Sequence, residues 1–307
     1  MTEPAPLHTT EGPPGGQAFW LHASDGVRLR TALWPGERGT VLVLPGRTEY
    51  IEKYALVVAD LACAGWGALV IDWRGQGLSD RLAGDAALGH VGQFSDYQLD
   101  LAAMRSAAES LGCHSPMPII AHSMGGCIAL RAFCNGLQVP AAAFSAPMWG
   151  LPLSRAMRLG IRTMAHLTRL LDRDTAYLPT TGPEFGLPSM PFVNNPLTRD
   201  SAQFVRMQGQ IRDNPALALG GPSLRWGGAA LSEMAALSRL PAPDTPAVIG
   251  LGSNERIVNS AAIQALAARW PKAELVEYPG AEHELLMEIP QTRTDFLSRV
   301  LALFDRC

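Results

Sequence analysis

The ten residues Met117–Gly126 limit the possible folds of this 307-residue chain more than any other stretch. A short apolar run ends at Ala121, Ser123 follows between a histidine and a methionine, and two glycines precede an alanine- and leucine-rich run. This pattern predicts a buried strand, a tight turn with Ser123 at its tip, and a helix. Such a turn crowds the backbone, so the positions two before and two after the serine must be small. Ala121 and Gly125 satisfy that condition, in a variant of the G-x-S-x-G elbow that lacks the first glycine.

The position of Ser123 on this turn suggests a chemical role for its hydroxyl group. A serine hydroxyl is a weak nucleophile until a base removes its proton and the fold holds it clear of its neighbours. A helix beginning after Ser123 would add N–H groups and a positive dipole end where negative charge develops. We therefore expect Ser123 to be a nucleophile; the alternative is an ordinary serine at a helix N-terminus.

Composition narrows the class of protein. With 47% apolar and 17% charged residues, the chain is expected to fold around a sizeable core. A net charge of −3 without a basic cluster argues against nucleic-acid binding. Residues 1–16 are rich in Pro, Gly, Thr and Glu and lack the features of a signal peptide, so we expect a flexible tail. No run is long enough to span a membrane.

The cysteines suggest a reducing compartment. All five lack the spacing of a metal site or a redox motif. We expect reduced cysteines in a cytoplasmic protein that needs no metal and no other cofactor.

Strand and helix signals alternate through most of the chain. Strands are predicted at 19–22, 27–34, 40–44, 67–72, from 117, 141–145, 247–251 and 274–278, and helices at 51–64, 96–111, 261–269 and 292–304. This alternation predicts an α/β fold with a mostly parallel, doubly wound sheet, built from residues 17–146 and 241–307. Residues 147–240 break the pattern with helices only, at 154–171, 198–211 and 222–237. We expect this insertion to form a helical cap over the carboxyl ends of the strands, where ligands bind in such sheets.

Two residues after later strands are candidates to assist the serine. His283 is the only one of seven histidines that follows the last two predicted strands, and we expect it to be the general base. Glu255 follows the strand at 247–251 and is the candidate acid that orients the imidazole. Asp244 precedes that strand and lies at the wrong end of the sheet. The alternative for Glu255 is a surface glutamate paired with Arg256.

Developing negative charge on a substrate oxygen needs two fixed backbone N–H groups. One is expected from Met124, directly after the nucleophile. The other is expected from Arg47, since Gly46 lets the loop after the strand at 40–44 approach closely.

These motifs together resemble a known family. The segments are Leu44–Tyr54, Asp72–Ser79, the serine turn, Gly252–Val258 and Gly280–Glu284. They are similar to the bacterial lysophospholipase and monoacylglycerol-lipase-like branch of the α/β-hydrolases, from about Phe19 to the C-terminus. The resemblance implies an α/β-hydrolase fold with a helical cap, and a monoacylglycerol or lysophospholipid ester as substrate. Pro45, Ala121 and Glu255 stand where this family usually has histidine, glycine and aspartate.

The sequence is compatible with several activities. A serine argues against dehalogenases and epoxide hydrolases, which use an aspartate nucleophile. A short-chain carboxylesterase, a serine peptidase and an acyltransferase remain, because the same three residues serve all of them. A non-catalytic binding module is least favoured, since a complete set of Ser, Glu and His occurs in the right order.

The substrate class depends on the residues of the cap. Some of its apolar residues must cover the core, and the remainder would line an acyl pocket or touch a membrane surface transiently; they are Leu151, Leu153, Met157, Leu159, Ile161, Met164, Leu167, Leu170 and Leu171. Five arginines could meet a phosphate or be solvated, namely Arg47, Arg74, Arg155, Arg158 and Arg162. The oligomeric state stays open.

Overall fold

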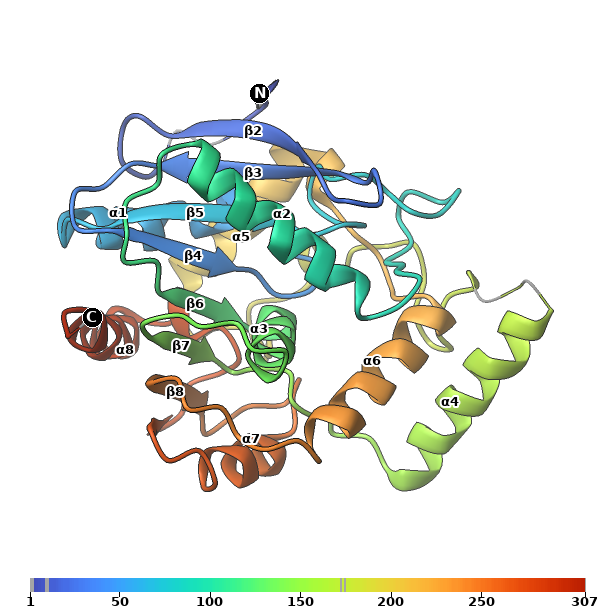
Figure 1. Ribbon diagram of the computed structural model, residues 1–307. Coiled ribbons are helices and arrows are strands. Elements are labelled where there is room, and N and C mark those ends of the chain that lie inside the picture. The colour runs from blue at the N-terminus through green and yellow to red at the C-terminus, as the bar shows by residue number, and fades with distance from the viewer. Residues whose placement is uncertain (1–2, 9–10, 172, 174, 307) are drawn as a thin grey trace.

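A computed structural model describes residues 3–8, 11–171, 173 and 175–306. Its centre is a nine-stranded sheet with the strand order β1-β2-β3-β5-β4-β6-β7-β8-β9 (Figure 1). The strands are β1 (Glu3–Ala5), β2 (Gln17–His22), β3 (Arg28–Trp34), β4 (Thr40–Leu44), β5 (Gly67–Asp72), β6 (Ile119–His122), β7 (Ala142–Ser145), β8 (Ala247–Gly252) and β9 (Ala273–Tyr278). Strands β5, β4, β6, β7, β8 and β9 run parallel, and β1, β2 and β3 extend the sheet as antiparallel strands. The predicted α/β class and mostly parallel sheet are confirmed.

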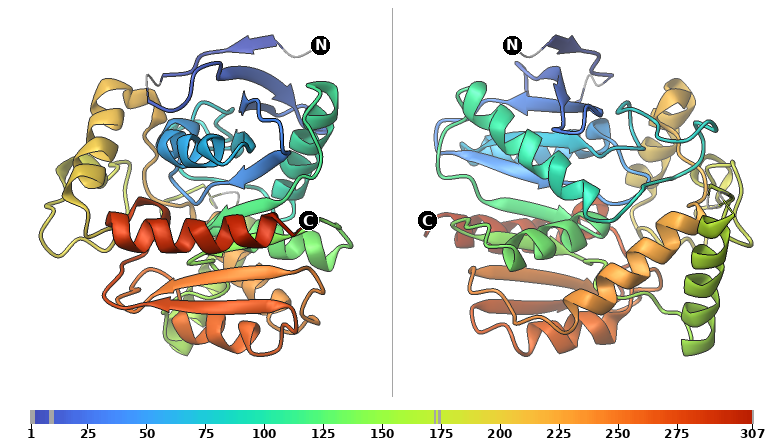
Figure 2. Two further views of the ribbon diagram at one scale, coloured as in Figure 1. Left: turned by 90° about the vertical axis from the view of Figure 1, so that its left-hand side faces the viewer. Right: turned by 45° about the vertical axis from the view of Figure 1, so that its right-hand side comes forward.

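The central strands separate two apolar layers. Along β4, Leu42 and Leu44 face one core, whereas Val41 and Val43 face the other. The first core is covered by α2 (Asp96–Ser110), α3 (Met124–Cys134) and α7 (Ser260–Ala267). The second is covered by α1 (Ala55–Cys63) and α8 (Pro290–Phe304) (Figure 2). A strand buried on both faces needs apolar residues at every position, which explains its unbroken Val/Leu sequence.

Residues near the N-terminus differ from the expected flexible tail. Strand β1 pairs antiparallel with β2, with Pro4 opposite Phe19. The Pro6 carbonyl accepts a hydrogen bond of 2.9 Å from Arg30, and the His8 N–H donates one of 3.0 Å to Glu52. For these residues the prediction is wrong, because short backbone contacts to a sheet edge leave no periodic apolar signal.

The chain between β7 and β8 is helical, with α4 (Arg155–Leu170), α5 (Ser201–Asp213) and α6 (Leu224–Leu237) and two short 3₁₀ turns, Leu187–Ser189 and Pro215–Leu217. Helix α5 buries Phe204 and Met207 in the second core, and α6 buries Trp226 and Leu231 in the first. Helix α4 buries no residue and stands at the outer edge beside α6 (Figure 2). No helix in the described ranges is both long and apolar enough to cross a membrane.

Candidate active site

Ser123 lies between the end of β6 and the start of α3, as the sequence predicts. Its φ and ψ of 47° and −113° are strained for a residue with a side chain, at a cost of about 1–3 kcal/mol. A Cβ atom at Gly125 would come within 2.1 Å of the Leu44 carbonyl oxygen, so the turn requires glycine there. The Ser123 side chain makes no capping hydrogen bond to α3. Ser123 therefore differs from an ordinary N-cap serine such as Ser154, which accepts a bond of 3.1 Å from the Met157 N–H.

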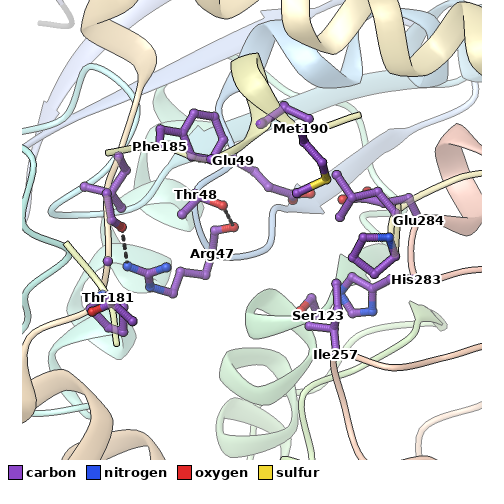
Figure 3. A pocket seen from close by; sticks show the side chains of 18 of the residues that line it. Arg47, Thr48, Glu49, Ser123, Thr181, Phe185, Met190, Ile257, His283 and Glu284 are labelled. Carbon is purple, nitrogen blue, oxygen red and sulfur yellow. Dashed lines mark hydrogen bonds between the residues drawn. The ribbon is translucent and has the colours of Figure 1, made fainter. Parts of the chain in front are cut away.

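His283 and Glu255 meet at the same sheet edge. His283 Nδ1 lies 2.7 Å from Glu255 Oε2, and both side chains are buried. Since a carboxylate only accepts hydrogen bonds, Nδ1 carries a proton, and in a neutral imidazole Nε2 then keeps its lone pair. Ser123 and His283 both line the same cavity, as Figure 3 shows.

Glu255 is also fixed by its own loop. Its Oε1 accepts hydrogen bonds from the N–H groups of Ile257 (2.6 Å) and Val258 (2.9 Å). Burial disfavours the charged carboxylate, but the hydrogen bond from His283 and these backbone hydrogen bonds bring its pKa below the ordinary value. Arg256, which would be the partner of a surface Glu255, instead pairs with Glu282 at 3.1 Å. Glu255 is thus an ionised acceptor for His283 rather than a surface ion-pair residue.

The loop after β4 supplies backbone N–H groups close to this site. The Gly46 N–H donates to Glu49, and the Thr48 N–H donates to Gln76 at 3.3 Å. None of the described residues accepts a hydrogen bond from the Arg47 N–H between them. Met124 begins α3, and the first N–H groups of a helix have no acceptor within it. Both N–H groups predicted for the oxyanion site can therefore donate to a substrate oxygen.

A cavity of about 590 Å³ opens in front of Ser123 (Figure 3). Its wall comes from the core and from the cap, and it is mainly apolar. The cap contributes Phe185, Leu187, Met190 and Met207.

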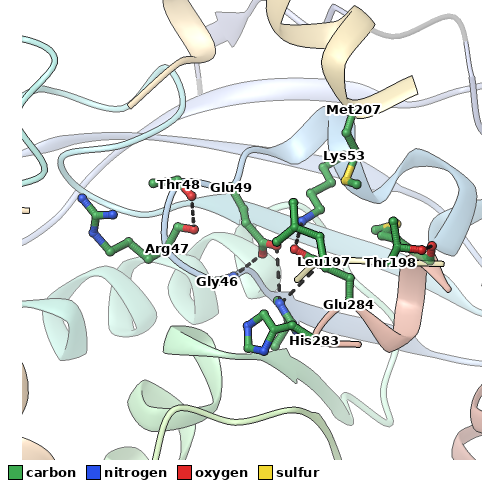
Figure 4. Close-up of polar contacts among 12 residues, drawn as sticks. Gly46, Arg47, Thr48, Glu49, Lys53, Leu197, Thr198, Met207, His283 and Glu284 are labelled. Atoms are coloured by element: carbon green, nitrogen blue, oxygen red, sulfur yellow. Dashed lines mark hydrogen bonds and ion pairs between the residues drawn. The ribbon is translucent and has the colours of Figure 1, made fainter. Parts of the chain in front are cut away.

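A buried charged cluster adjoins the site and was not predicted from the sequence (Figure 4). Lys53 Nζ pairs with Glu49 and lies 2.6 Å from Glu284 Oε1. Tyr54 donates a hydrogen bond of 2.6 Å to Glu49, and His122 Nε2 lies 3.6 Å from Glu49 and 3.5 Å from Glu284. The cluster joins the loop after β4, through Gly46, to the residue after His283. The i,i+4 spacing of Glu49 and Lys53 was the available signal, but Glu284 is 231 residues away from Lys53.

The two carboxyls of this cluster have opposite pKa shifts. Burial would raise the pKa of Glu49, but Lys53, His122 and hydrogen bonds lower it to about 2. Burial outweighs the attraction of Lys53 at Glu284 and raises the pKa of that carboxyl. Burial also lowers the pKa of His122, despite the nearby Glu49.

Glu49, His122 and Glu284 also have the geometry of a metal site, with ligand atoms within 4.8 Å of one another. However, the Lys53 ammonium contacts both carboxylates and supplies the positive charge that a metal ion would bring. The residues therefore do not fit a metal unless Lys53 moves away.

Replacing Lys53 with methionine should destabilise the fold by about 3–5 kcal/mol, because two buried carboxylates lose their cation. Chemical denaturation measures this loss. The matched control is Lys272→Met, which removes an exposed pair with Asp244 and should cost at most about 1 kcal/mol. Equal losses in the two variants would mean that the buried cluster does not depend on Lys53.

The five arginines that are candidates for binding a phosphate lie in different surroundings. Arg74 pairs with Asp25 at 2.7 Å and with Asp100 at 2.7 Å, and it does not line the cavity. The cap arginines at 155, 158 and 162 lie on the exposed helix α4. Arg47 alone of the five lines the cavity in front of Ser123.

Comparisons with known proteins agree with this architecture. The family model described as serine aminopeptidase S33 (Hydrolase_4) matches residues 35–290. Lysophospholipase L2 of Escherichia coli strain K12 is 32% identical over 279 residues, covering 87% of this chain and 80% of that protein. Probable lysophospholipase L2 of Haemophilus influenzae is 28% identical, covering 86% and 82%. Among solved structures, a monoglyceride lipase from Saccharomyces cerevisiae has a TM-score of 0.75 at 20% identity, covering 98% of this chain and 99% of its own.

The fold and the site define an α/β-hydrolase with a helical insertion over its strand ends. The chain belongs to the Hydrolase_4 family of α/β-hydrolases, in the lysophospholipase and monoglyceride-lipase-like group. It is a carboxylic ester hydrolase.

Proposed function

We propose that the protein hydrolyses the acyl ester of a lysophospholipid or monoacylglycerol through Ser123, His283 and Glu255. One observation carries the proposal: His283, which lies 2.7 Å from Glu255, lines the same mainly apolar cavity as Ser123 on its strained turn. The names of the relatives, lysophospholipase L2 and monoglyceride lipase, support this substrate class.

The reaction proceeds in two half-reactions. His283 Nε2 takes the Ser123 hydroxyl proton while Oγ attacks the ester carbonyl carbon, and the oxyanion accepts hydrogen bonds from the Arg47 and Met124 N–H groups. The intermediate then expels the glycerol oxygen, which takes the proton from His283, and an acyl-serine remains. Water attacks this second ester with His283 again as base, releasing the fatty acid and restoring Ser123. Glu255 holds the imidazole in the required tautomer and stabilises it while it is charged.

The acyl chain is expected to occupy the apolar part of the cavity, between Met148, which follows β7, and Leu187 and Met190 further along the cap. Burying a chain there gains about 0.8 kcal/mol per methylene. Medium and long chains should therefore react with a higher kcat/KM than short ones.

A panel of monoacylglycerol and lysophospholipid esters with chains of graded length tests this substrate class. We expect kcat/KM to rise with chain length from short to medium chains. A strict preference for short chains would identify a short-chain carboxylesterase instead. Hydrolysis of aminoacyl amides in place of esters would identify a peptidase, and acyl transfer to an added alcohol in preference to water would identify an acyltransferase.

We further propose that α4 carries the protein to lipid surfaces. Its basic side chains recur at the spacing of one helix face, at Arg155, Arg158, Arg162, His166 and Arg169. Its other exposed face is apolar, with Met157, Met164, Leu167 and Leu170. A helix of this kind binds an anionic lipid interface through the apolar face while the arginines meet the head groups.

Replacing Leu167 and Leu170 together with serine should weaken binding to anionic phospholipid vesicles about tenfold, because less apolar area enters the interface. Vesicle co-sedimentation measures the change. Val205→Ser on α5 is the matched control, since Val205 is 55% exposed and Leu167 is 53% exposed. If the control lowers vesicle binding as much as the α4 variant, α4 is not the contact surface.

A further inference from the structure

Arg47 extends from the loop after β4 into the cavity in front of Ser123. Its guanidinium points away from Ser123 and His283, toward Thr181 of the cap (Figure 3). A substrate with its ester carbonyl at Ser123 can therefore reach the Arg47 side chain with its head group.

The surrounding structure is built to hold this guanidinium. Arg47 Nη2 donates a hydrogen bond of 2.8 Å to the Gly220 carbonyl, and the group lies 5.2 Å from the centre of the Trp226 ring. A Cβ at Gly89 would come within 2.3 Å of Nη2, so the absence of a side chain at this position makes room for the arginine. Arg47 Nε is buried without a hydrogen-bond partner among the described residues. The side chain is thus positioned with donor capacity unused.

No carboxylate in the described part of the chain forms an ion pair with Arg47. Burial accordingly lowers its pKa to about 10. The buried Arg30 differs, because it pairs with Glu52 and Asp72, both at 2.7 Å. A partly buried cation without an anion still carries a desolvation cost, which an anionic ligand would offset.

We propose that Arg47 binds the phosphate of the substrate head group and makes the enzyme prefer lysophospholipids over monoacylglycerols. This inference rests on the proposed ester hydrolysis at Ser123 and names the substrate within that class. Guanidinium groups bind phosphate oxygens through short, charge-assisted hydrogen bonds, and among the described residues only Nη2 of Arg47 has a hydrogen-bond acceptor. A monoacylglycerol has no charge to place there.

The test compares two substrates with the same acyl chain, a lysophospholipid and a monoacylglycerol, both below their micellar concentrations. In Arg47→Gln we expect the ratio of the two kcat/KM values to fall at least tenfold, mainly through the KM of the lysophospholipid. The ratio cancels any disturbance of the oxyanion loop that affects both substrates. Arg47→Lys keeps the charge but loses the planar set of donors. Its ratio of kcat/KM values should therefore lie between the ratios of Arg47→Gln and the parent.

Arg81→Gln is the matched control. Arg81 also ties the core to the cap loop, through hydrogen bonds of 3.1 Å to the carbonyls of Ala216 and Ala218, but it does not line the cavity. Its substrate ratio should equal that of the parent. A similar fall in Arg81→Gln would attribute the effect to cap docking and overturn the proposal.

A second measurement needs no variant. In the parent enzyme, sn-glycero-3-phosphate should inhibit monoacylglycerol hydrolysis with an inhibition constant at least tenfold below that of glycerol. Equal constants, or an unchanged ratio in Arg47→Gln, would overturn the assignment of Arg47 while ester hydrolysis stands. Absence of activity on both esters in the parent would instead refute the proposed function.

Discussion

Alanine at Ser123 should lower kcat/KM for ester hydrolysis about 10⁵- to 10⁶-fold, because the acyl-enzyme can no longer form. The small residual rate would come from substrate binding and the two oxyanion donors, which the substitution leaves in place. Steady-state hydrolysis of a medium-chain ester measures the loss. A serine-directed fluorophosphonate should label the parent and leave the variant unlabelled.

Ser154→Ala is the matched control for that loss. Ser154 also stands at the start of a helix, but its side chain caps α4 through the Met157 N–H. Its replacement should cost about 1 kcal/mol of stability at most and leave turnover within a few-fold of the parent. Activity of Ser123→Ala within tenfold of the parent would contradict the proposed mechanism.

Glutamine at Glu255 should lower kcat about 10³- to 10⁴-fold while the fold persists. The amide is uncharged and no longer stabilises the imidazolium, and its NH₂ group favours the wrong tautomer of His283. Glu255→Asp keeps the charge at a shorter reach and should retain more activity than the glutamine variant. The measurement is kcat at saturating substrate across neutral pH.

The pH dependence of stability gives a second readout for Glu255. Its pKa in the folded protein lies below the ordinary value, so its charge stabilises the fold above that ordinary pKa. This contribution is lost as the pH falls through the folded pKa. The parent should therefore exceed Glu255→Gln in stability near neutral pH, and the difference should shrink in acid.

Glu282→Gln is the control for both readouts. Glu282 lies in the loop that carries His283, but it pairs with Arg256 instead of the imidazole. We expect its kcat to stay within about threefold of the parent. If both glutamine variants are equally slow, the effect belongs to the loop and not to the acid that orients His283.

Local sequence patterns predicted most of the fold. Each buried strand is a continuous apolar run, and each helix that covers the sheet has an apolar face, so short-range periodicity located them to within a few residues. The order of Ser123, Glu255 and His283 after successive strands predicted that they would meet, because parallel strands place their carboxyl ends at one edge. Those inferences need no knowledge of contacts between distant side chains.

The features that the sequence did not predict depend on residues that are distant in sequence and close in space. The pairing of β1 with β2 and the contact of Lys53 with Glu284 produce no repeating pattern in the sequence. Neither contact restricts the residue types of the positions that flank it. Five arginines look equivalent in the sequence, but their surroundings differ in the folded protein. Arg74 pairs with two carboxylates, the α4 arginines are exposed to solvent, and Arg47 lines the cavity with no carboxylate partner among the residues that the structure describes. Residue type and spacing therefore establish the sheet and the order of the reacting groups. The electrostatic surroundings of each charge follow only from the folded chain, because burial and distance set the energy of a charge.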